Sequence, residues 1–262
     1  MEENKKELEK DPKEVEEKNN SKKEKKVSED TKKKEKNKET KKETNGKSEK
    51  LKKEATDTVN KVKDTIKNVD IKKDSIETKG FIVDMFKNPL GKIKEIVDKD
   101  TSKYFTYAII ILAIWVVAKL ISRSFSFSHI WGFSNVGSAI LLILISGITP
   151  IVSILVMSLI VFIMNTKNKK QLTTVITAVI SASIPLVISA VVSLLTIFGT
   201  KASILTTPFS GFCNVISTIL MYFAIKSIFG VEKNSEFIKK FVIIQGIFYI
   251  VYIVLSFFEI YI

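Results

Sequence analysis

The polar side chains that could do chemistry lie within long apolar stretches, and most of them are serine, threonine or proline. In the third and fourth stretches they recur every few residues, and Asn214 is the one strong hydrogen-bonding side chain well inside a span. Such groups either line a path for a polar solute or bond across a close helix contact. Packing is the favoured interpretation, and the residues that either role would use are Pro150, Ser181, Pro185, Pro208 and Asn214.

Catalytic, metal-binding and cofactor-binding sites are not expected. Cys213 is the single cysteine and His129 the single histidine, which argues against a disulfide framework, a cysteine-based zinc site and a histidine-centred triad. No glycine-rich phosphate loop, nucleophile elbow or paired-carboxylate motif occurs. The centres of the apolar stretches also lack ionisable residues, which argues against an ion-coupled relay. We therefore expect no enzyme activity, no cofactor and no metal.

The elements that hold these side chains follow from the distribution of charge. Residues 1–100 contain 30 of the 41 basic and 25 of the 28 acidic residues, so the rest of the chain is almost uncharged. A single water-soluble globule is excluded, because the apolar runs are too long for an ordinary core. The sequence instead predicts a charged first part in water and a second part in lipid.

Residues 1–50 have too few large apolar side chains to offset the loss of chain entropy on folding. A disordered, Lys/Glu-rich arm is therefore predicted. With 30 basic against 25 acidic residues, residues 1–100 have a net charge of only +5 and few aromatic residues between the lysines, so nucleic acid is not an expected partner. A solvated tether is favoured, with attraction to anionic lipid headgroups as the lesser alternative.

Residues 51–80 carry a heptad-like apolar stripe, which Lys73 breaks. This pattern predicts an amphipathic helix of marginal stability, since it is too short for a self-sufficient coiled coil. The stripe consists of Ala55, Val59, Val62, Ile66, Val69 and Ile76.

Residues 88–100 are predicted to form an interfacial helix before the first span. Asn88 can cap a helix and Pro89 can open one. An apolar face follows, with lysines elsewhere on the helix, which is typical of a segment that lies on a membrane surface. That face consists of Leu90, Ile93, Ile96 and Val97.

Five apolar stretches follow, each long enough to cross a hydrocarbon core of about 30 Å at about 1.5 Å per residue. Because backbone groups in lipid must be satisfied internally, the predicted fold class is all-α, a polytopic bundle of five transmembrane helices. The stretches are 104–121, 136–164, 172–197, 203–229 and 237–258. The second is too long and is interrupted before Pro150, so whether residues 137–146 form a separate or re-entrant piece stays open. Kinks are expected at the three prolines inside the spans.

The loop charges predict the orientation, because Lys and Arg resist translocation. The loops after the second and fourth spans are lysine-rich, whereas the alternate loops carry only Arg123 and Lys201. The N-terminus is therefore expected in the cytoplasm and the C-terminus outside the cell membrane. The loop lysines are Lys167, Lys169, Lys170, Lys226, Lys233, Lys239 and Lys240.

Three segments resemble the YIP domain family, the Ypt/Rab GTPase-interacting proteins, and its bacterial members in particular. They are the juxtamembrane Met85–Leu90 with its Asn-Pro, Asn168–Leu172 followed by the small-residue segment Ala178–Pro185, and Tyr222–Lys226 with the last span. The resemblance covers residues 81–262. It implies a multi-pass membrane protein without known catalysis, tied in eukaryotes to Rab binding and vesicle formation.

Two functions are compatible with these patterns. The leading hypothesis is a non-enzymatic membrane scaffold or membrane-organising protein that displays its arm to cytoplasmic partners. The alternative is a channel or carrier for an uncharged small solute, which would use the polar faces of the third and fourth spans. The expected partners are the lipid bilayer, cytoplasmic proteins through the arm, and further copies of the chain.

Overall fold

The computed structural model describes residues 49, 52–99, 102–130, 136–165, 168, 170–230 and 234–261. The predicted disordered arm, residues 1–50, lies outside the described residues apart from Glu49. The chain divides into two compact units, Met1–Thr56 and Asp57–Ile262. The second unit contains helices α2 to α9. Its described residues are almost entirely helical and contain no strand, which confirms the all-α prediction.

Short helices precede the first apolar helix. Residues 57–68 are helical, and α2 (Ile71–Lys87) begins after Asp70. The Asp70 carboxylate accepts hydrogen bonds of 3.2 Å from the backbone N–H groups of Lys72 and Lys73, and so caps α2. The apolar stripe expected across residues 51–80 is therefore divided between two helices at Asp70.

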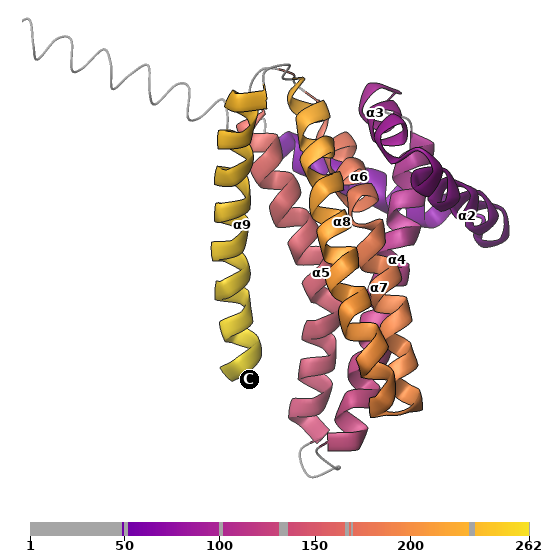
Figure 1. The fold of residues 1–262 in the computed structure, drawn as a ribbon. Helices are drawn as coiled ribbons and strands as arrows, with labels where there is room; N and C mark the ends of the chain where they lie inside the picture. The colour runs from indigo at the N-terminus through magenta and orange to yellow at the C-terminus, as the bar shows by residue number, and fades with distance from the viewer. Residues whose placement is uncertain are drawn as a thin grey trace, which may run out of the picture. The chain divides into compact units, whose positions relative to one another are not determined.

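The next helix, α3 (Pro89–Lys99), begins where the sequence predicts. The Asn88 side-chain oxygen accepts a 3.0 Å hydrogen bond from the Gly91 N–H, and Pro89 is the first helical residue. Of the predicted apolar face of α3, Ile93, Ile96 and Val97 are buried where the helix packs on α6 and α8, whereas Leu90 is exposed. Figure 1 shows α2 and α3 together near one end of the long helices.

The first two apolar helices, α4 (Ser102–Ile130) and α5 (Val136–Met164), pack along each other. Gly147 permits their close approach, because a Cβ atom there would clash with Cδ2 of Leu120. Residues 137–146 are the first turns of α5 and not a separate piece. The helix continues through the buried Pro150.

The third apolar stretch is broken into α6 (Leu172–Ala182) and α7 (Ile184–Ser193), followed by the 3-10 turn η2 (Leu194–Phe198). The two parts are bent by 47°, which agrees with the kink expected near Pro185. Proline has no N–H to continue the helical bonds, and the next N–H, that of Leu186, donates to the Ser183 carbonyl. The Ala182 carbonyl instead accepts a 3.0 Å hydrogen bond from the Ser217 hydroxyl. The break is thus closed by a side chain of a neighbouring helix.

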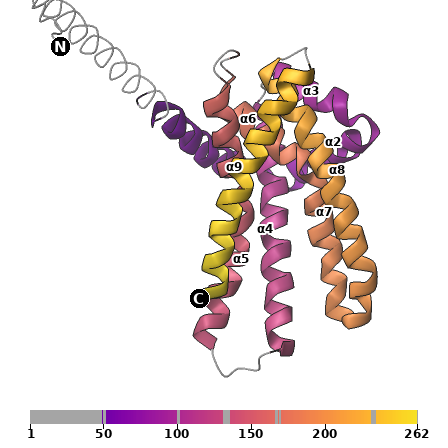
Figure 2. The same cartoon turned by 60° about the vertical axis from the view of Figure 1, so that its left-hand side comes forward.

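Two long helices complete the chain. After the 3-10 turn η3 (Thr200–Ala202), α8 (Ser203–Phe229) ends at Gly230, whose φ of 58° provides the left-handed cap. The last helix, α9 (Asn234–Tyr261), packs on α5 and meets α8 at an aromatic cluster. In that cluster the Tyr222 ring centroid lies 5.0 Å from that of Phe237 and 5.2 Å from that of Phe241. Figure 2 shows α9 running beside α5.

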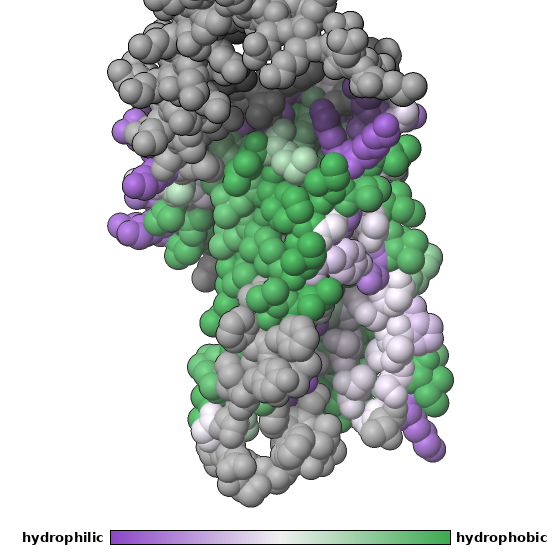
Figure 3. Space-filling view, turned by 90° about the vertical axis from the view of Figure 1, so that its left-hand side faces the viewer, coloured by the Kyte–Doolittle hydropathy of each residue, from purple (hydrophilic) through white to green (hydrophobic). Residues whose placement is uncertain are grey.

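Several of these helices are long and apolar enough to cross a membrane. Among the described residues, Ser102–Phe125, Ala139–Met164 and Ser203–Phe229 have the required length and composition. The bent pair Leu172–Ala182 and Ile184–Phe198 is a fourth if the two helices form one span. The chain is therefore compatible with a multi-pass membrane protein. Figure 3 shows a broad apolar surface on the face that includes α9, with hydrophilic residues gathered mainly toward its upper end.

Candidate functional site

The five candidate residues from the apolar stretches do not come together in one site. Pro150 is buried in α5, and Ser181 and Pro185 are buried at the break between α6 and α7. Pro208 and Asn214 lie on the exposed side of α8. Buried positions and positions on the outer surface do not line the same cavity, so these residues do not form one polar path within the described part of a single copy.

Two hydroxyl groups, one in α6 and one at its C-cap Ser183, bond back to the backbone of the helix. All eleven residues of this helix are buried. The Thr177 hydroxyl donates to the Thr173 carbonyl at 2.8 Å, and the Ser183 hydroxyl donates to the Val179 carbonyl at 2.9 Å. Such back-bonding satisfies a hydroxyl without a ligand. The Ser181 hydroxyl is buried without a hydrogen-bond partner among the described residues.

A different polar arrangement lies where α2 meets the first turns of α4. The Tyr107 hydroxyl donates a 2.6 Å hydrogen bond to Oε2 of Glu77, and Nζ of Lys103 lies 2.9 Å from the same oxygen. The Tyr107 hydroxyl, and next the Lys103 ammonium, lower the pKa of the Glu77 carboxyl. Glu77 is therefore a carboxylate at neutral pH, and its bonds are charge-assisted.

The same arrangement is repeated on α3. The Tyr104 hydroxyl donates a 2.6 Å hydrogen bond to Oε1 of Glu95, while Nζ of Lys99 and of Lys92 lie 2.9 Å and 3.0 Å from the Glu95 oxygens. Lys99, then Tyr104 and Lys92, lower the pKa of Glu95 to about 2. Two short helices are thus each held to α4 by a tyrosine that donates to a carboxylate.

An aromatic contact fills the space between the two pairs. Tyr104 and Tyr107 are three residues apart and share one face of α4. The buried Phe81 ring of α2 has its centroid 5.8 Å and 5.5 Å from those of the two tyrosines, and Nζ of Lys92 lies 5.1 Å from the Tyr104 ring centroid. We call the two tyrosines with Glu77 and Glu95 the tyrosine clamp.

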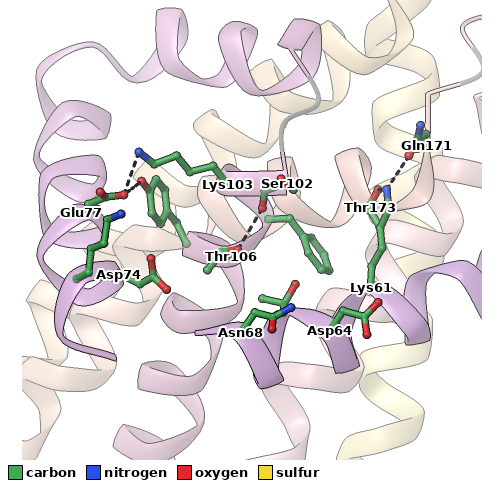
Figure 4. Close-up of a pocket in the computed structure, with 14 residues that line it drawn as sticks. Lys61, Asp64, Asn68, Asp74, Glu77, Ser102, Lys103, Thr106, Gln171 and Thr173 are labelled. Atoms are coloured by element: carbon green, nitrogen blue, oxygen red, sulfur yellow. Dashed lines mark hydrogen bonds and ion pairs between the residues drawn. The ribbon is translucent and has the colours of Figure 1, made fainter. Parts of the chain in front are cut away.

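An open hollow of about 660 Å³ lies beside the clamp, and we call it the polar cleft. Residues 61–68, α2, the first turns of α4 and the start of α6 surround it (Figure 4). Nζ of Lys61 donates to Oε1 of Gln171 at 2.9 Å and to Oγ1 of Thr173 at 3.3 Å, which joins the first of these helices to α6. The charged lining residues are Lys61, Asp64, Lys73, Asp74, Glu77 and Lys103.

The chemistry available here is binding by charge and hydrogen bonds. Among the described residues no group of three His, Cys, Asp or Glu side chains is placed to hold a metal ion. The lining of the cleft has equal numbers of cationic and anionic side chains. A ligand that carries both signs of charge would match it better than a purely anionic one.

Sequence reasoning did not single out the clamp. Tyr107 and Glu77 are 30 residues apart, so no local spacing predicts their contact. The available signal was a pair of tyrosines at the start of the first apolar stretch, where aromatic residues with a polar tip favour the membrane interface.

Comparison with protein-family models, curated proteins and solved structures gave no match to this chain.

Proposed function

We propose that the chain is a non-enzymatic, multi-pass membrane scaffold. In this proposal the tyrosine clamp holds α2 and α3 as a platform on the end of the membrane bundle. The clamp is the observation that carries the proposal, because charge-assisted hydrogen bonds tie both helices to the first turns of α4. A partner bound to the segment that precedes α2 would thereby be coupled to the membrane part.

The packing of the bundle supports a scaffold over a solute carrier. The hydroxyls expected to line a path in the third span lie in a fully buried helix, and the Ser217 hydroxyl bonds to the broken backbone of that helix. The Ser217 bond joins two helices, and this kind of contact favours a fixed frame. The carrier interpretation would need them to face an accessible hollow.

The proposed topology has five spans, with the N-terminus in the cytoplasm and the C-terminus outside the cell membrane. The 28-residue α9 is the proposed fifth span. Lys170, in the loop after the second span, donates a 2.9 Å hydrogen bond to the Val97 carbonyl of α3. This bond supports placing the lysine-rich loop on the same side as the platform, as the positive-inside rule requires.

Membership of the YIP domain family and binding of cytoplasmic proteins through residues 1–50 belong to the same proposal. The family assignment rests on the motifs at Met85–Leu90 and Ala178–Pro185. A role in organising membranes or traffic is what the resemblance implies.

Topology is tested first, with protease added to sealed cells that express the chain tagged at either end. We expect the C-terminal tag to be cut at once and the N-terminal tag only after the cells are permeabilised. Cleavage of the N-terminal tag in sealed cells would overturn the orientation.

The scaffold role is tested by cross-linking in cells and quantifying the proteins recovered. Three chains are compared with the intact one: a chain lacking residues 1–50, the double variant Tyr104→Phe/Tyr107→Phe, and the matched control Tyr249→Phe, whose side chain is exposed on α9. We expect the deletion to abolish recovery, the clamp variant to reduce it, and the control to leave it unchanged. Identical recovery from all four chains, together with solute uptake by liposomes containing the intact chain, would favour the carrier.

A further inference from the structure

The side chains of α2 are segregated around the helix. The side toward α4 contains the buried Phe81 and Met85. Asp74 and Glu77 are half-buried, and both accept hydrogen bonds within the protein. A third side is exposed and has lysines interspersed with large apolar side chains, and we call it the outer face of α2. The outer face consists of Lys72, Ile76, Lys79, Val83, Phe86 and Lys87.

The spacing of these six residues is that of one helix face. At about 100° per residue, they lie within about 100° of the helix circumference. Ile76 is 66% exposed, Phe86 53% and Val83 43%, so the described part of the protein leaves these apolar side chains uncovered. Lys73 and Asp84 lie at one edge of the face and oppose each other in charge. With three lysines and no acidic residue, the outer face has a charge of +3.

Two contacts show how α2 is oriented on the long helices. Glu77 bonds to Lys103 and Tyr107, which lie in the first turns of α4. Ser75 instead lines an apolar hollow of about 420 Å³ together with α4 residues between Ile110 and Ile121, farther along that helix. Ser75 and Glu77 are about 200° apart around α2. The Glu77 side of α2 therefore points toward the charged end of the bundle, and the Ser75 side points toward its apolar length.

The outer face of α2 is nearer to the Ser75 side. Around the helix, Phe86 is about 20° from Ser75, Lys79 about 40° and Val83 about 80°, whereas Asp84 is about 180° away. The outer face thus lies at the boundary between the charged end of the bundle and its apolar surface, and Figure 1 shows α2 near one end of the long helices. In the proposed membrane placement, this boundary is the headgroup region of one leaflet.

We propose that the outer face of α2 docks on anionic phospholipids of the bilayer that surrounds the bundle. Its apolar side chains enter the region of the upper acyl chains, and its lysines bind the phosphate groups. Helix α2 then takes the interfacial position that the sequence predicts for residues 88–100, whose apolar face is mostly buried in protein. This inference rests on the membrane placement proposed above and is independent of the scaffold role.

The composition of the outer face fits a lipid surface better than another anionic surface. Apolar side chains between lysines combine burial in the acyl region with attraction to anionic headgroups. A nucleic acid would pair with the lysines but leave the apolar side chains in water, because its outer surface is phosphate. An acidic protein is the remaining partner, and the depth of the outer face in the bilayer distinguishes it from lipid.

Spin labels measure this depth. The full-length chain in a Cys213→Ala background is reconstituted in nanodiscs of phosphatidylcholine and phosphatidylglycerol. Labels are placed at Val83→Cys on the outer face, at the neighbouring exposed Asp84→Cys on the opposite side, and at the exposed Val117→Cys along α4 as the membrane reference. Collisions with oxygen, which concentrates in lipid, and with a water-soluble nickel complex are compared. We expect several-fold less access of nickel at Val83→Cys than at Asp84→Cys.

Lipid selectivity is measured by native mass spectrometry of the full-length chain in detergent with an equal mixture of phosphatidylglycerol and phosphatidylcholine. Lys79→Gln should lower the ratio of retained phosphatidylglycerol to phosphatidylcholine roughly fivefold, as expected for one lysine near an anionic surface. Lys72→Gln/Lys79→Gln/Lys87→Gln should lower it further. The matched control is Lys94→Gln, an exposed lysine on α3, which should leave the ratio unchanged. Circular dichroism and the melting temperature show that each variant is folded.

Nickel access at Val83→Cys equal to that at Asp84→Cys, with Val117→Cys still in lipid, would overturn the inference and leave the outer face to an acidic protein. A loss of phosphatidylglycerol in Lys94→Gln as large as in Lys79→Gln would overturn it as well, because the selectivity would then reflect overall charge. Nickel access at Val117→Cys would instead contradict the membrane placement itself. Failure of the cross-linking test leaves these outcomes unaffected, so the two proposals fail separately.

Discussion

Around α6, the buried hydroxyl groups of Thr177, Ser183 and Ser217 bond to helix backbone, whereas at the first turns of α4 hydroxyl groups bond to carboxylates of other helices. In the first region Ser217 reaches the Ala182 carbonyl across a helix contact. In the second, Tyr104 and Tyr107 reach Glu95 and Glu77. Both regions hold helices together, but only the second uses charge.

In the proposed membrane placement, the difference follows from the surroundings of each region. A carboxylate in the middle of a hydrocarbon core is costly, so helix contacts there depend on small residues and weak hydrogen bonds. Near the membrane interface, water can solvate lysine and glutamate. The desolvation free energy of a charged contact is therefore lower there. The interior should therefore respond to changes of volume, and the platform to changes of charge and pH.

The largest effect is expected where α4 and α5 are closest. Gly147→Leu places a side chain against Leu120, whose Cδ2 would clash with the new Cβ. Overpacking of this kind costs about 1–3 kcal/mol or more, so the chain should unfold at a lower temperature or denaturant concentration in detergent. Thermal unfolding followed by circular dichroism measures the change.

Gly211→Leu is the matched control for that substitution. A Cβ atom at the exposed Gly211 of α8 would meet nothing within 4 Å. We expect its unfolding temperature to stay close to that of the intact chain. The double variant Gly147→Ala/Leu120→Ala should recover stability relative to Gly147→Leu, and an equal loss in both glycine-to-leucine variants would contradict a close contact at Gly147.

In the platform, the largest loss of stability is expected when the N-cap of α3 is removed. Asn88→Ala removes the acceptor of the Gly91 N–H. The loss of a helix N-cap costs about 1 kcal/mol. Amide hydrogen exchange of residues 91–99 should become faster in Asn88→Ala and return to normal in Asn88→Asp, which keeps the acceptor. Unchanged exchange in the alanine variant would show that the cap does not hold this helix.

In the interior, Ser217→Ala removes the bond that closes the break in the third span. Interhelical hydrogen bonds in membranes contribute about 0.6 kcal/mol on average, so a small loss of stability is expected. Thr218→Ala is the control, because the Thr218 hydroxyl bonds to Asn214 of its own helix. Chemical unfolding in detergent compares the two, and a larger loss in the control would reverse the roles assigned to these hydroxyls.

Much of the architecture could be predicted from the sequence because it depends on local pattern. The cap at Asn88, the helix beginning at Pro89 and the disturbance near Pro185 follow from the chemistry of those residues. The exposed position of Asn214 could not be predicted, since it depends on which face of α8 the neighbouring helices cover. The clamp could not be predicted either, because Glu77 meets Tyr107 only after α2 folds back onto α4.

The smallest effect is expected from acid, and it should be confined to the platform. Because the pKa of Glu95 is lowered to about 2 in the folded chain, its carboxylate stabilises the docked α3 fully above the ordinary pKa of about 4.5. This contribution is lost as the pH falls from there toward about 2. A spin label at Asp98→Cys on the exposed side of α3, in a Cys213→Ala background, should therefore become more mobile over this range.

In Glu95→Gln the label should already be mobile at neutral pH and show little further change. A label at Lys201→Cys, exposed in η3 just before α8, serves as the control, and an equal change in mobility there would indicate global unfolding and not release of the platform.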